Sequence, residues 1–201
     1  MKYSIGRNLV ITDGDSNCCR DALVIRQGNA FAPAHPTTEL CLKLLERTFA
    51  ASPVNSILDV GCGTGILALA CLKLGAERAL ALDISRSAML VTRENAFRNH
   101  LEERIDLIQG SIQSVNARFD LIVANLHFST LVGMAGNFRE LLNANGTLII
   151  SGFFDMEFYH LDRALANLGF RRGELLYKDY VMVDLPPSMS STFGGAQYFR
   201  N

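Results

Sequence analysis

Ser56-Ile57-Leu58-Asp59-Val60-Gly61-Cys62-Gly63-Thr64-Gly65 is the stretch that decides the fold, and Ile66-Leu67-Ala68-Leu69-Ala70 continues it. The apolar run at its start predicts a strand that is covered on both faces. The three glycines predict a sharp turn without side chains that would block a ligand. The apolar residues after the turn predict a helix, whose first N–H groups and positive dipole end point back at the turn. We therefore expect a polar or anionic ligand there.

Two acidic residues accompany this turn and favour a nucleoside ligand. Asp59 stands two positions before the first glycine, and Asp83 closes the next apolar run, Ala79-Leu80-Ala81-Leu82. A carboxylate at the end of that second strand can accept hydrogen bonds from both hydroxyls of a ribose. The dinucleotide fingerprint G-x-G-x-x-G is not met, because Ile66 holds its sixth position. The D-x-G-x-G-x-G spacing followed by Asp83 resembles class I S-adenosylmethionine-dependent methyltransferases, and the alternative is a turn that only permits close packing of strand and helix.

Strand and helix patterns alternate from residue 56 onward. Strands are predicted over 56–60, 79–83, 105–109, 119–124 and 147–151, and helices over about 65–74, 86–99 with Ser85 as its cap, 130–142 and 155–168. This alternation predicts an α/β fold with a doubly wound, mostly parallel, seven-stranded Rossmann-like sheet. In such a sheet ligands bind beyond the carboxyl ends of the strands. The turn at 61–65, Asp83, Gly110-Ser111-Ile112 and Asn125 all fall at such ends.

The two ends of the chain are expected to be rich in strands. Residues 8–12 and 22–25 predict strands on either side of a turn cluster at 13–17, which makes residues 1–30 a short β preamble, a hairpin that acts as a lid or an edge. Residues 31–201 form the donor-binding core, so that 1–201 is expected to be a single domain. Closing strands are predicted near 171–177, 180–184 and 197–200. The stretch 186–195 is predicted to be an exposed loop, with a substrate-facing role as the alternative.

The stretch before the first glycine turn predicts a helix that ends near residue 49. Pro36 fixes its entry, and Thr37 or Thr38 is expected to cap it or to contact the ligand. His35 is interpreted as a hydrogen-bonding loop residue.

Composition and charge narrow the possible binding partners and the expected cellular compartment. The chain has 201 residues, of which 49% are hydrophobic, and a net charge of −1. That charge gives no electrostatic argument for nucleic acid or an anionic membrane, although a local basic patch can still bind RNA. The five cysteines lack metal-ligand spacing, so we expect no metal site and reduced thiols in a cytosolic protein, with Cys41 and Cys71 as small core residues. The sequence shows neither a signal peptide nor an apolar run of membrane-spanning length.

The residues at the strand ends suggest how S-adenosylmethionine, with S-adenosylhomocysteine as its product, would be held. Gly61, Gly63 and Gly65 let the backbone approach the methionine moiety and the ribose. Asp83 accepts from the ribose hydroxyls, Ile84 packs on the adenine, and Ser111 and Ile112 border it. Asp59 orders the turn by accepting backbone N–H bonds, or contacts the ligand amine through water.

Asn125-Leu126-His127-Phe128 follows the fourth predicted parallel strand and supplies the candidate catalytic residues. The Asn125 carbonyl oxygen can accept a hydrogen bond from an amine and aim its lone pair at the methyl group. Phe128 can wall the substrate with its ring facing a cationic centre, and His127 can take a proton near neutral pH. The alternatives are a strand-end turn for Asn125, a core position for Phe128 and simple exposure for His127. Transfer from a sulfonium needs little acid–base machinery, which fits the lack of a Ser-His-Asp or metal constellation.

Several blocks together resemble the PrmA family, whose members methylate amino groups on a large-subunit ribosomal protein. They span about residues 28–152 and comprise His35-Pro36-Thr37-Thr38-Glu39-Leu40-Cys41-Leu42, Leu58-Asp59-Val60-Gly61-Cys62-Gly63-Thr64-Gly65-Ile66-Leu67-Ala68, Lys73-Leu74-Gly75-Ala76, Glu94-Asn95-Ala96 and Asp120-Leu121-Ile122-Val123-Ala124-Asn125. The resemblance implies donor contacts at Thr38, Gly61, Asp83 and Asn125.

Three features depart from that family. Its separate N-terminal recognition domain cannot be supplied by the thirty residues here. Its loop A-F-G-T-G-x-H-P-T-T is replaced by Ala30-Phe31-Ala32-Pro33-Ala34-His35-Pro36-Thr37-Thr38, which is shorter and lacks glycine. Its A-N-I-L-A is replaced by Ala124-Asn125-Leu126-His127-Phe128, which is similar to the Asn-Pro-Pro-Tyr/Phe motif of amine, amide and nucleobase N-methyltransferases. The resemblance therefore implies the donor site and leaves the ribosomal substrate open.

The leading hypothesis is a cytosolic N-methyltransferase that acts on amino groups of a protein. The first alternative is the same enzyme class acting on a small molecule or an RNA base. The second is a catalytically silent protein that binds the donor and acts through partners, and the third is a nicotinamide-dependent oxidoreductase.

Overall fold

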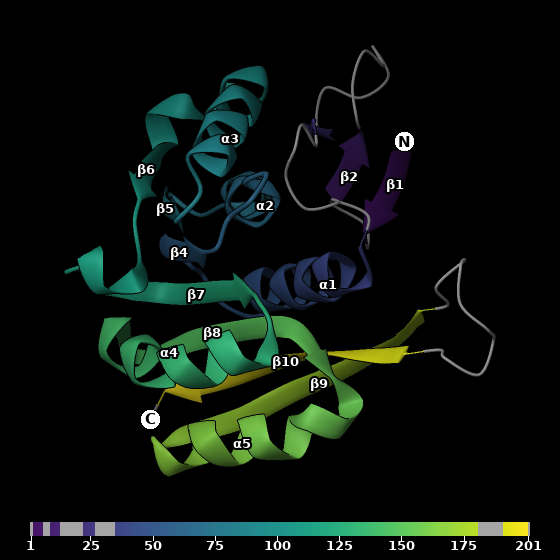
Figure 1. The fold of residues 1–201 in the computed structure, drawn as a ribbon. Coiled ribbons are helices and arrows are strands. Elements are labelled where there is room, and N and C mark those ends of the chain that lie inside the picture. Colours follow the sequence, from purple (N-terminus) through teal and green to yellow (C-terminus); the bar gives the residue numbers. More distant parts are fainter. Residues whose placement is uncertain (1, 6–8, 13–21, 27–34, 181–190, 201) are drawn as a thin grey trace.

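The computed structural model describes residues 2–5, 9–12, 22–26, 35–180 and 191–200. Within these ranges a seven-stranded sheet has the order β6-β5-β4-β7-β8-β10-β9 (Figure 1). Its strands are β4 (Ser56–Val60), β5 (Arg78–Asp83), β6 (Ile105–Gln109), β7 (Phe119–Asn125), β8 (Leu142–Phe154), β9 (Phe170–Tyr180) and β10 (Ser191–Arg200). Strands β4 to β8 pair in parallel, and β10 is antiparallel to both β8 and β9. The predicted mostly parallel α/β sheet is confirmed.

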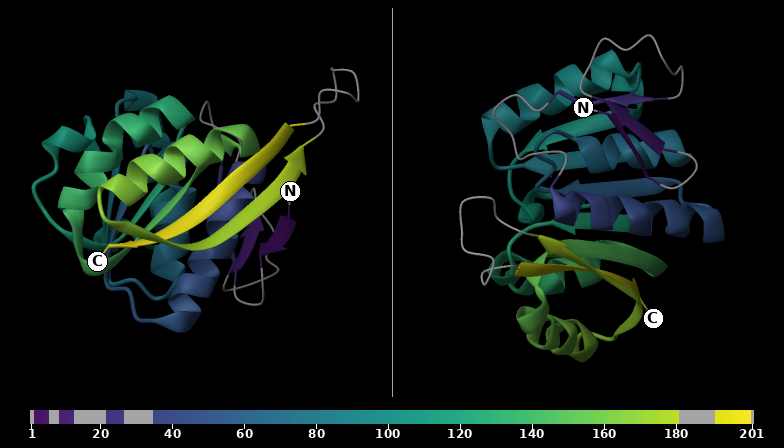
Figure 2. Two further views of the ribbon diagram at one scale, coloured as in Figure 1. Left: turned by 90° about the horizontal axis from the view of Figure 1, so that it is seen from below. Right: turned by 90° about the vertical axis from the view of Figure 1, so that its right-hand side faces the viewer.

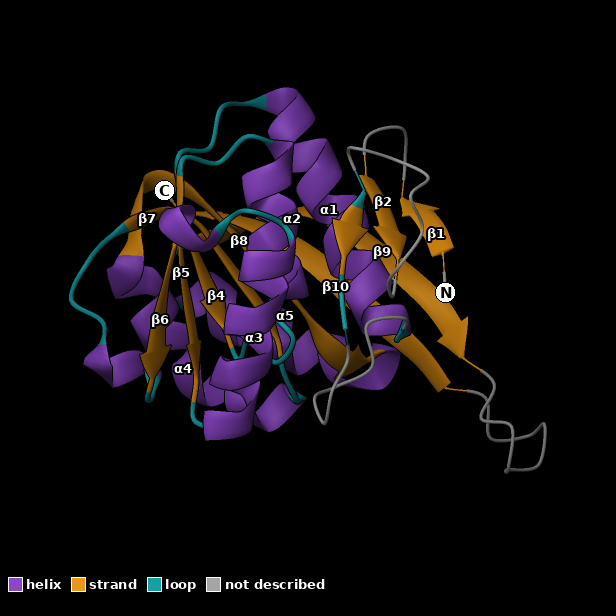
Figure 3. Ribbon diagram, turned by 90° about the horizontal axis from the view of Figure 1, so that it is seen from above, coloured by secondary structure: helices purple, strands orange, loops and turns teal. Residues whose placement is uncertain are grey.

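Helices cover both faces of this sheet (Figures 2 and 3). Helices α1 (Pro36–Ala51), α2 (Ile66–Leu74) and α3 (Arg86–Arg98) pack on one face, and α4 (Phe128–Leu141) and α5 (Phe158–Asn167) pack on the other. Successive side chains of a strand point to opposite faces. In β4, Ile57 accordingly joins the core beneath α1 to α3, whereas Leu58 and Val60 join the core beneath α4 and α5. The doubly wound arrangement thus follows from the unbroken apolar run.

The strand order reverses between β4 and β7, and this reversal positions the site. The chain runs outward from β4 through β5 to β6 and then returns to place β7 on the other side of β4. The chain leaves β4 toward α2 on one face of the sheet and leaves β7 toward α4 on the other face. These diverging connections open a crevice at the carboxyl ends of the two strands.

Helix starts follow the predictions only in part. Ser85 caps α3 by accepting from the Ala88 N–H at 3.4 Å, as predicted. The prediction that Thr37 or Thr38 caps α1 is wrong. His35 is the N-cap, because its Nδ1 accepts from the Thr37 N–H at 3.4 Å and lies 2.8 Å from the Thr37 hydroxyl. Burial lowers the pKa of His35, which favours the neutral ring, whose Nδ1 can accept the bond from Thr37.

The N-terminal strands pair differently from the prediction. Strand β1 (Lys2–Ile5), which was not predicted, forms an antiparallel pair with β2 (Leu9–Thr12), whereas β2 and β3 (Leu23–Val24) run parallel. The predicted hairpin between residues 8–12 and 22–25 is therefore wrong, and the turn cluster at 13–17 lies outside the described residues. The small sheet lies beside α1 and α2 (Figure 1).

The C-terminal strands are longer than predicted. Residues 191–195 belong to β10 and pair with both neighbours, so the predicted loop over 186–195 is wrong for that part. The glycines in this stretch suggested a loop, but packing requires them in the strand. A Cβ at Gly194 would lie 2.2 Å from the Phe153 ring, and one at Gly195 would lie 2.9 Å from the Leu40 Cβ. Of the predicted strand 180–184, Tyr180 belongs to β9, and residues 181–184 lie outside the described ranges.

Several boundaries also shift. The predicted strand 147–151 is part of β8, helix α4 begins at Phe128, and a 3₁₀ turn (Asp155–Glu157) precedes α5. Cys41 and Cys71 are fully buried core residues, as predicted. Among the described helices, none has both the length and the apolar character needed to cross a membrane.

Candidate functional site

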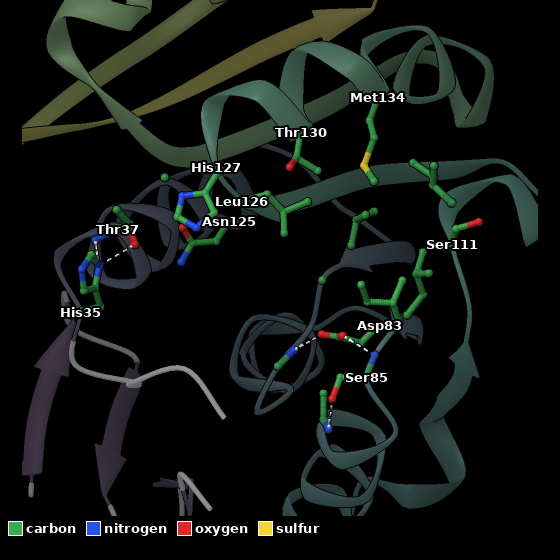
Figure 4. Close-up of a pocket in the computed structure, with 18 of the residues that line it drawn as sticks. His35, Thr37, Asp83, Ser85, Ser111, Asn125, Leu126, His127, Thr130 and Met134 are labelled. Carbon is green, nitrogen blue, oxygen red and sulfur yellow. Dashed lines mark hydrogen bonds between the residues drawn. The ribbon is translucent and has the colours of Figure 1, made fainter. Parts of the chain in front are cut away.

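A cavity of about 660 Å³ lies at the carboxyl ends of the parallel strands (Figure 4). The turns that follow β4, β5, β6 and β7 form its floor, and α4 and the start of α1 contribute to its walls. This volume lies within the range of about 300–1,000 Å³ that small-molecule sites occupy. Of the predicted site residues, the cavity is lined by Gly61, Gly63, Asp83, Ile84, Ser111, Ile112, Asn125 and His127.

The glycine turn holds a backbone conformation that other residues rarely adopt. Gly61, Gly63 and Gly65 have φ values of 74°, 55° and 77°. The Gly61 N–H donates to the Leu82 carbonyl at 2.8 Å, which ties the turn to the end of β5. A Cβ at Gly63 would meet no heavy atom within 4 Å, because this residue faces the cavity. A side chain there would take up space that a ligand can use.

Asp83 joins the turns after β4 and β5. Its Oδ2 accepts from the Gly63 N–H at 3.0 Å, and its Oδ1 accepts from the Ser85 N–H at 2.9 Å. Figure 4 shows the carboxylate between these two turns at the edge of the cavity. Each oxygen has a second lone pair, so that the carboxylate can also accept from ligand hydroxyls.

Asp59 lies behind the glycine turn rather than in the cavity wall, because the alternation along β4 directs its side chain to the α1–α2 face. It is 1% exposed, and its Oδ2 accepts from the Ala68 N–H in the first turn of α2 at 3.0 Å. Burial and, to a smaller extent, the nearby charge of Asp83 raise the pKa of this carboxyl to about 7. The bond to Ala68 opposes that shift.

The raised pKa of Asp59 predicts a pH-dependent stability. The folded state keeps a proton up to about pH 7 that the unfolded chain loses near pH 4, so the stabilisation is complete below pH 4 and is lost as the pH rises through 7. Relative to Asp59→Asn, the free energy of unfolding of the wild type should fall by about 2–3 kcal/mol between pH 5 and pH 8. Urea denaturation at both pH values measures this difference, and parallel behaviour of the two proteins would contradict the assignment.

The predicted adenine residues lie together at one end of the cavity. Ile84 is 78% exposed, Ile112 is buried at the start of a 3₁₀ turn (Ile112–Ser114), and Ser111 precedes it. Met134 of α4 faces this end from the opposite wall (Figure 4). The arrangement can hold a flat, largely apolar ring.

Asn125 ends β7 and lies at the other end of the cavity, beside His127 (Figure 4). Its Nδ2 donates to the Thr38 hydroxyl of α1 at 3.3 Å. This bond commits the amide nitrogen to Thr38, so that Oδ1 is the atom that can accept from an incoming amine. His127 is exposed and is the N-cap residue of α4.

Four predicted site residues do not line the cavity within the described part of the chain. Thr38 is 2% exposed and reaches the site through Asn125. Gly65 is the N-cap residue of α2, where a Cβ would lie 2.6 Å from Thr92 Cγ2. Asp59 is buried behind the turn, as described above. Phe128 packs against the core beneath α4, which agrees with its alternative interpretation as a core residue.

The structure also brings residues to the site that the sequence did not single out. Phe154 and Phe193 line the cavity and stack with their ring centroids 4.9 Å apart, and the His35 ring meets Phe193 edge-on at 5.2 Å. Gly152 lines the wall with a φ of 98°, and a Cβ there would lie 2.3 Å from the Leu126 carbonyl oxygen. The sequence signal that could have identified Gly152 is its place inside the apolar run 148–153, because a glycine within a strand often marks a close approach of another backbone segment. Phe193 was hidden in the stretch predicted to be a loop.

Comparison with known proteins identifies a matching family and sequence relatives of this chain. The model of the ribosomal protein L11 methyltransferase (PrmA) family matches residues 3–180. The ribosomal protein L11 methyltransferase of Sorangium cellulosum is 42% identical over 136 residues, which are 67% of this chain and 43% of that protein. The chain spans about half the length of the curated relatives it matches.

Solved structures share the fold. A ribosomal protein L11 methylase from Lactobacillus delbrueckii subsp. bulgaricus superimposes with a TM-score of 0.80 at 28% identity, over 100% of this chain and 98% of that chain. The N-methyltransferase NodS from Bradyrhizobium japonicum, solved with S-adenosyl-L-homocysteine, has a TM-score of 0.65 at 16% identity, over 83% of this chain and 89% of that chain. At that identity the second likeness shows the fold alone.

Proposed function

The chain belongs to the ribosomal protein L11 methyltransferase (PrmA) family, and on this premise we propose that it is an S-adenosylmethionine-dependent N-methyltransferase acting on amino groups of a ribosomal protein. One observation carries the proposal: a single cavity joins the open face of Gly63, the Asp83 carboxylate and the Asn125 amide at the carboxyl ends of the strands. We propose that residues 1–201 act as one domain, with residues 1–30 beside the donor-binding core 31–201, and that the reaction takes place in the cytoplasm.

The residues present fit the donor. S-adenosylmethionine supplies a methyl group that is activated by its bond to a sulfonium. Asp83 is suited to accept from the ribose hydroxyls, because both of its oxygens are already oriented by backbone N–H groups. Ile84, Ser111 and Ile112 border the adenine end, Gly61 lines the cavity, and the open space at Gly63 leaves room for the remainder of the donor. NodS, which shares this fold, was solved with S-adenosyl-L-homocysteine, the product of this donor, which supports the use of S-adenosylmethionine.

The chain's part in the transfer is to position an amine. Asn125 Oδ1 accepts one N–H of the neutral amine, which leaves the nitrogen lone pair aimed into the cavity. The methyl–sulfur bond breaks as the methyl–nitrogen bond forms, and the resulting ammonium must lose a proton. His127 lies exposed beside Asn125, where its imidazole can pass that proton to solvent.

The aromatic part of the cavity lining is suited to a side chain with an apolar stem. Phe154, which is 37% exposed, and Phe193 form a stacked pair there, and the ring faces of aromatic residues attract cationic groups. A lysine-like side chain of a protein can lay its methylene groups on these rings and present its amine to Asn125. This supports a protein as the acceptor.

Replacing Asp83 with alanine should weaken binding of S-adenosylhomocysteine by about 1–3 kcal/mol, the range for leaving buried polar groups without partners. Isothermal titration calorimetry measures the change, and Asp106→Ala, at an exposed position on β6, is the matched control. Because Asp83 also holds the N–H groups of Gly63 and Ser85, part of the loss can come from the turns. An analogue without ribose hydroxyls separates the two effects, since Asp83→Ala should weaken its binding less than it weakens binding of S-adenosylhomocysteine. Unchanged affinity of Asp83→Ala for the natural ligand would refute the ribose assignment.

Transfer of radiolabelled methyl groups tests the function as a whole. The wild type and Asn125→Ala are incubated with labelled S-adenosylmethionine and either purified ribosomal protein L11 or fractionated lysate of the source cell. Label in L11, or in one ribosomal protein band, that is lost with the variant supports the proposal. Label in RNA or in the small-molecule fraction would replace the proposed acceptor. Donor binding without any transfer would favour a silent binding protein, and binding of NAD instead of S-adenosylmethionine would favour an oxidoreductase.

A further inference from the structure

Asn95 of α3 and Asn99, the C-cap residue of that helix, hold the N-terminal segment in the manner of a neighbouring strand. Asn99 accepts from the Val24 N–H at 2.8 Å and donates to the Val24 carbonyl at 2.7 Å. Asn95, one turn earlier, accepts from the Arg26 N–H and donates to the Arg26 carbonyl, both at 2.9 Å. Both asparagines are buried, so each amide replaces the hydrogen bonds that water would make with this stretch of backbone.

Asn95 differs from Asn99 in one contact. Its Nδ2 also donates to the Thr64 carbonyl of the glycine turn at 2.9 Å, whereas Asn99 Nδ2 donates instead to the Asn95 carbonyl within α3. Asn95 is 0% exposed and therefore joins the N-terminal segment to the glycine turn through a single buried amide. The rigid geometry of that amide makes the two contacts dependent on each other.

The contact lies next to the part of the turn that faces the cavity. Thr92, on the same face of α3, donates to the Gly63 carbonyl at 3.1 Å, so α3 holds two successive carbonyls of the turn from behind. From the other side, Asp83 holds the Gly63 N–H. The orientation of the peptide groups around Gly63 is thus set by α3 on one side and by the ribose-binding candidate on the other.

We propose that Asn95 is a positioning residue that couples docking of residues 24–26 on α3 to the shape of the glycine turn, so that this docking and donor binding strengthen each other. The inference rests on the proposed function, because it takes the turn at 61–65 as part of the donor site. Coupling of this kind is reciprocal: if docking favours the donor, the donor favours docking to the same extent. Nothing in the Asn95 amide contacts the cavity itself, so its effect passes through Thr64.

A comparison of Asn95→Ala with Asn99→Ala tests the coupling. Both changes remove a buried amide that pairs with the N-terminal segment, but only the first removes the bond to Thr64. Calorimetric titration with S-adenosylhomocysteine should show affinity about 10-fold weaker for Asn95→Ala. The affinity of Asn99→Ala should fall much less, to within about twofold of the wild type, because Asn95 still holds both Arg26 and the Thr64 carbonyl in that variant. Equal weakening in the two variants would overturn the specific role of Asn95.

Hydrogen exchange distinguishes coupling through Asn95 from a general loss of stability in the variant. The Val24 amide is the reporter, because its partner Asn99 is unchanged in Asn95→Ala. S-adenosylhomocysteine should slow exchange at Val24 in the wild type and should have no effect there in Asn95→Ala. The Asn55 amide, which donates to Asp120 Oδ2 and precedes the amino end of β4, is the control that the ligand should leave unchanged.

The wild-type experiment alone can overturn the inference, so it does not depend on the variant folding. Ligand binding without slower exchange at Val24 would overturn the coupling and leave the proposed function intact. A wild type that binds no S-adenosylhomocysteine would overturn the proposed function and the coupling with it.

Discussion

Asn125→Ala is expected to lower the rate of methyl transfer by about 100-fold while the affinity for S-adenosylhomocysteine stays within a few-fold of the wild type. Asn125 ends β7 with its Nδ2 bonded to Thr38, so that Oδ1 can hold the acceptor amine in line with the methyl group. Loss of this alignment affects the transfer and leaves the ribose and adenine contacts in place. Single-turnover transfer to ribosomal protein L11 gives the rate, and calorimetry gives the affinity.

Two further variants show whether the amide acts as argued. Thr38→Val removes the hydroxyl that orients Asn125 and should lower the rate less than Asn125→Ala does, since the carbonyl oxygen itself is kept. Asn116→Ala changes an exposed asparagine after the 3₁₀ turn and should leave both quantities unchanged. If Asn125→Ala lost donor affinity as much as rate, Asn125 would be a donor contact rather than a residue that positions the acceptor.

Gly152→Ala is expected to cost about 3 kcal/mol of folding free energy or more, and to lower methyl transfer as well. The added Cβ would lie 2.3 Å from the Leu126 carbonyl oxygen and 2.8 Å from its carbon. Both are backbone atoms, so no side-chain rotation relieves the contact. The Leu126 N–H also donates to the Ser151 carbonyl at 3.0 Å, which holds the two segments together. The turn after β7 must then move, and Asn125 moves with it.

Gly169→Ala is the matched control for this change. Gly169 has a φ of 82°, close to the 98° of Gly152, but a Cβ there would meet nothing within 4 Å. Its substitution should therefore cost only the backbone penalty of about 1–2 kcal/mol. Urea denaturation of the two variants isolates the contact with Leu126 as the difference between them. Equal losses of stability in the two variants would contradict the prediction and show that the Leu126 backbone moves away from the added Cβ at little cost.

The sequence predicted well which residues meet at the carboxyl ends of the strands, because the patterns that place them are local. Apolar runs, glycines and the acidic ends of β4 and β5 are fixed by positions close together in the chain. Parallel strands bring their carboxyl ends to one edge, so the turn at 61–65, Asp83, Ser111 and Asn125 meet as predicted once the alternation is recognised. The resemblance to the PrmA family, confirmed by the match over residues 3–180, rests on the same local blocks.

Predictions that depended on pairing between distant segments were less successful. The N-terminal strands were expected to form one hairpin, but β2 and β3 pair in parallel, and Asn99 at the end of α3 holds Val24 of β3. The stretch 191–195 reads as a loop because it is rich in serine, threonine and glycine. Its glycines are required by the ring of Phe153 and by Leu40, which no local pattern reveals.

Local patterns in the sequence are enough to predict the doubly wound sheet, the glycine turn and the carboxylate beside it, because each follows from the spacing and ends of the apolar runs or from the conformations that glycine alone adopts freely. Which side chains reach the cavity depends on how the strands pair. The two-residue alternation of β4 turned Asp59 away from it, and the pairing of β10 brought Phe193 onto Phe154. Those outcomes depend on contacts between residues far apart in the chain, whose geometry exists only when the whole sheet has formed.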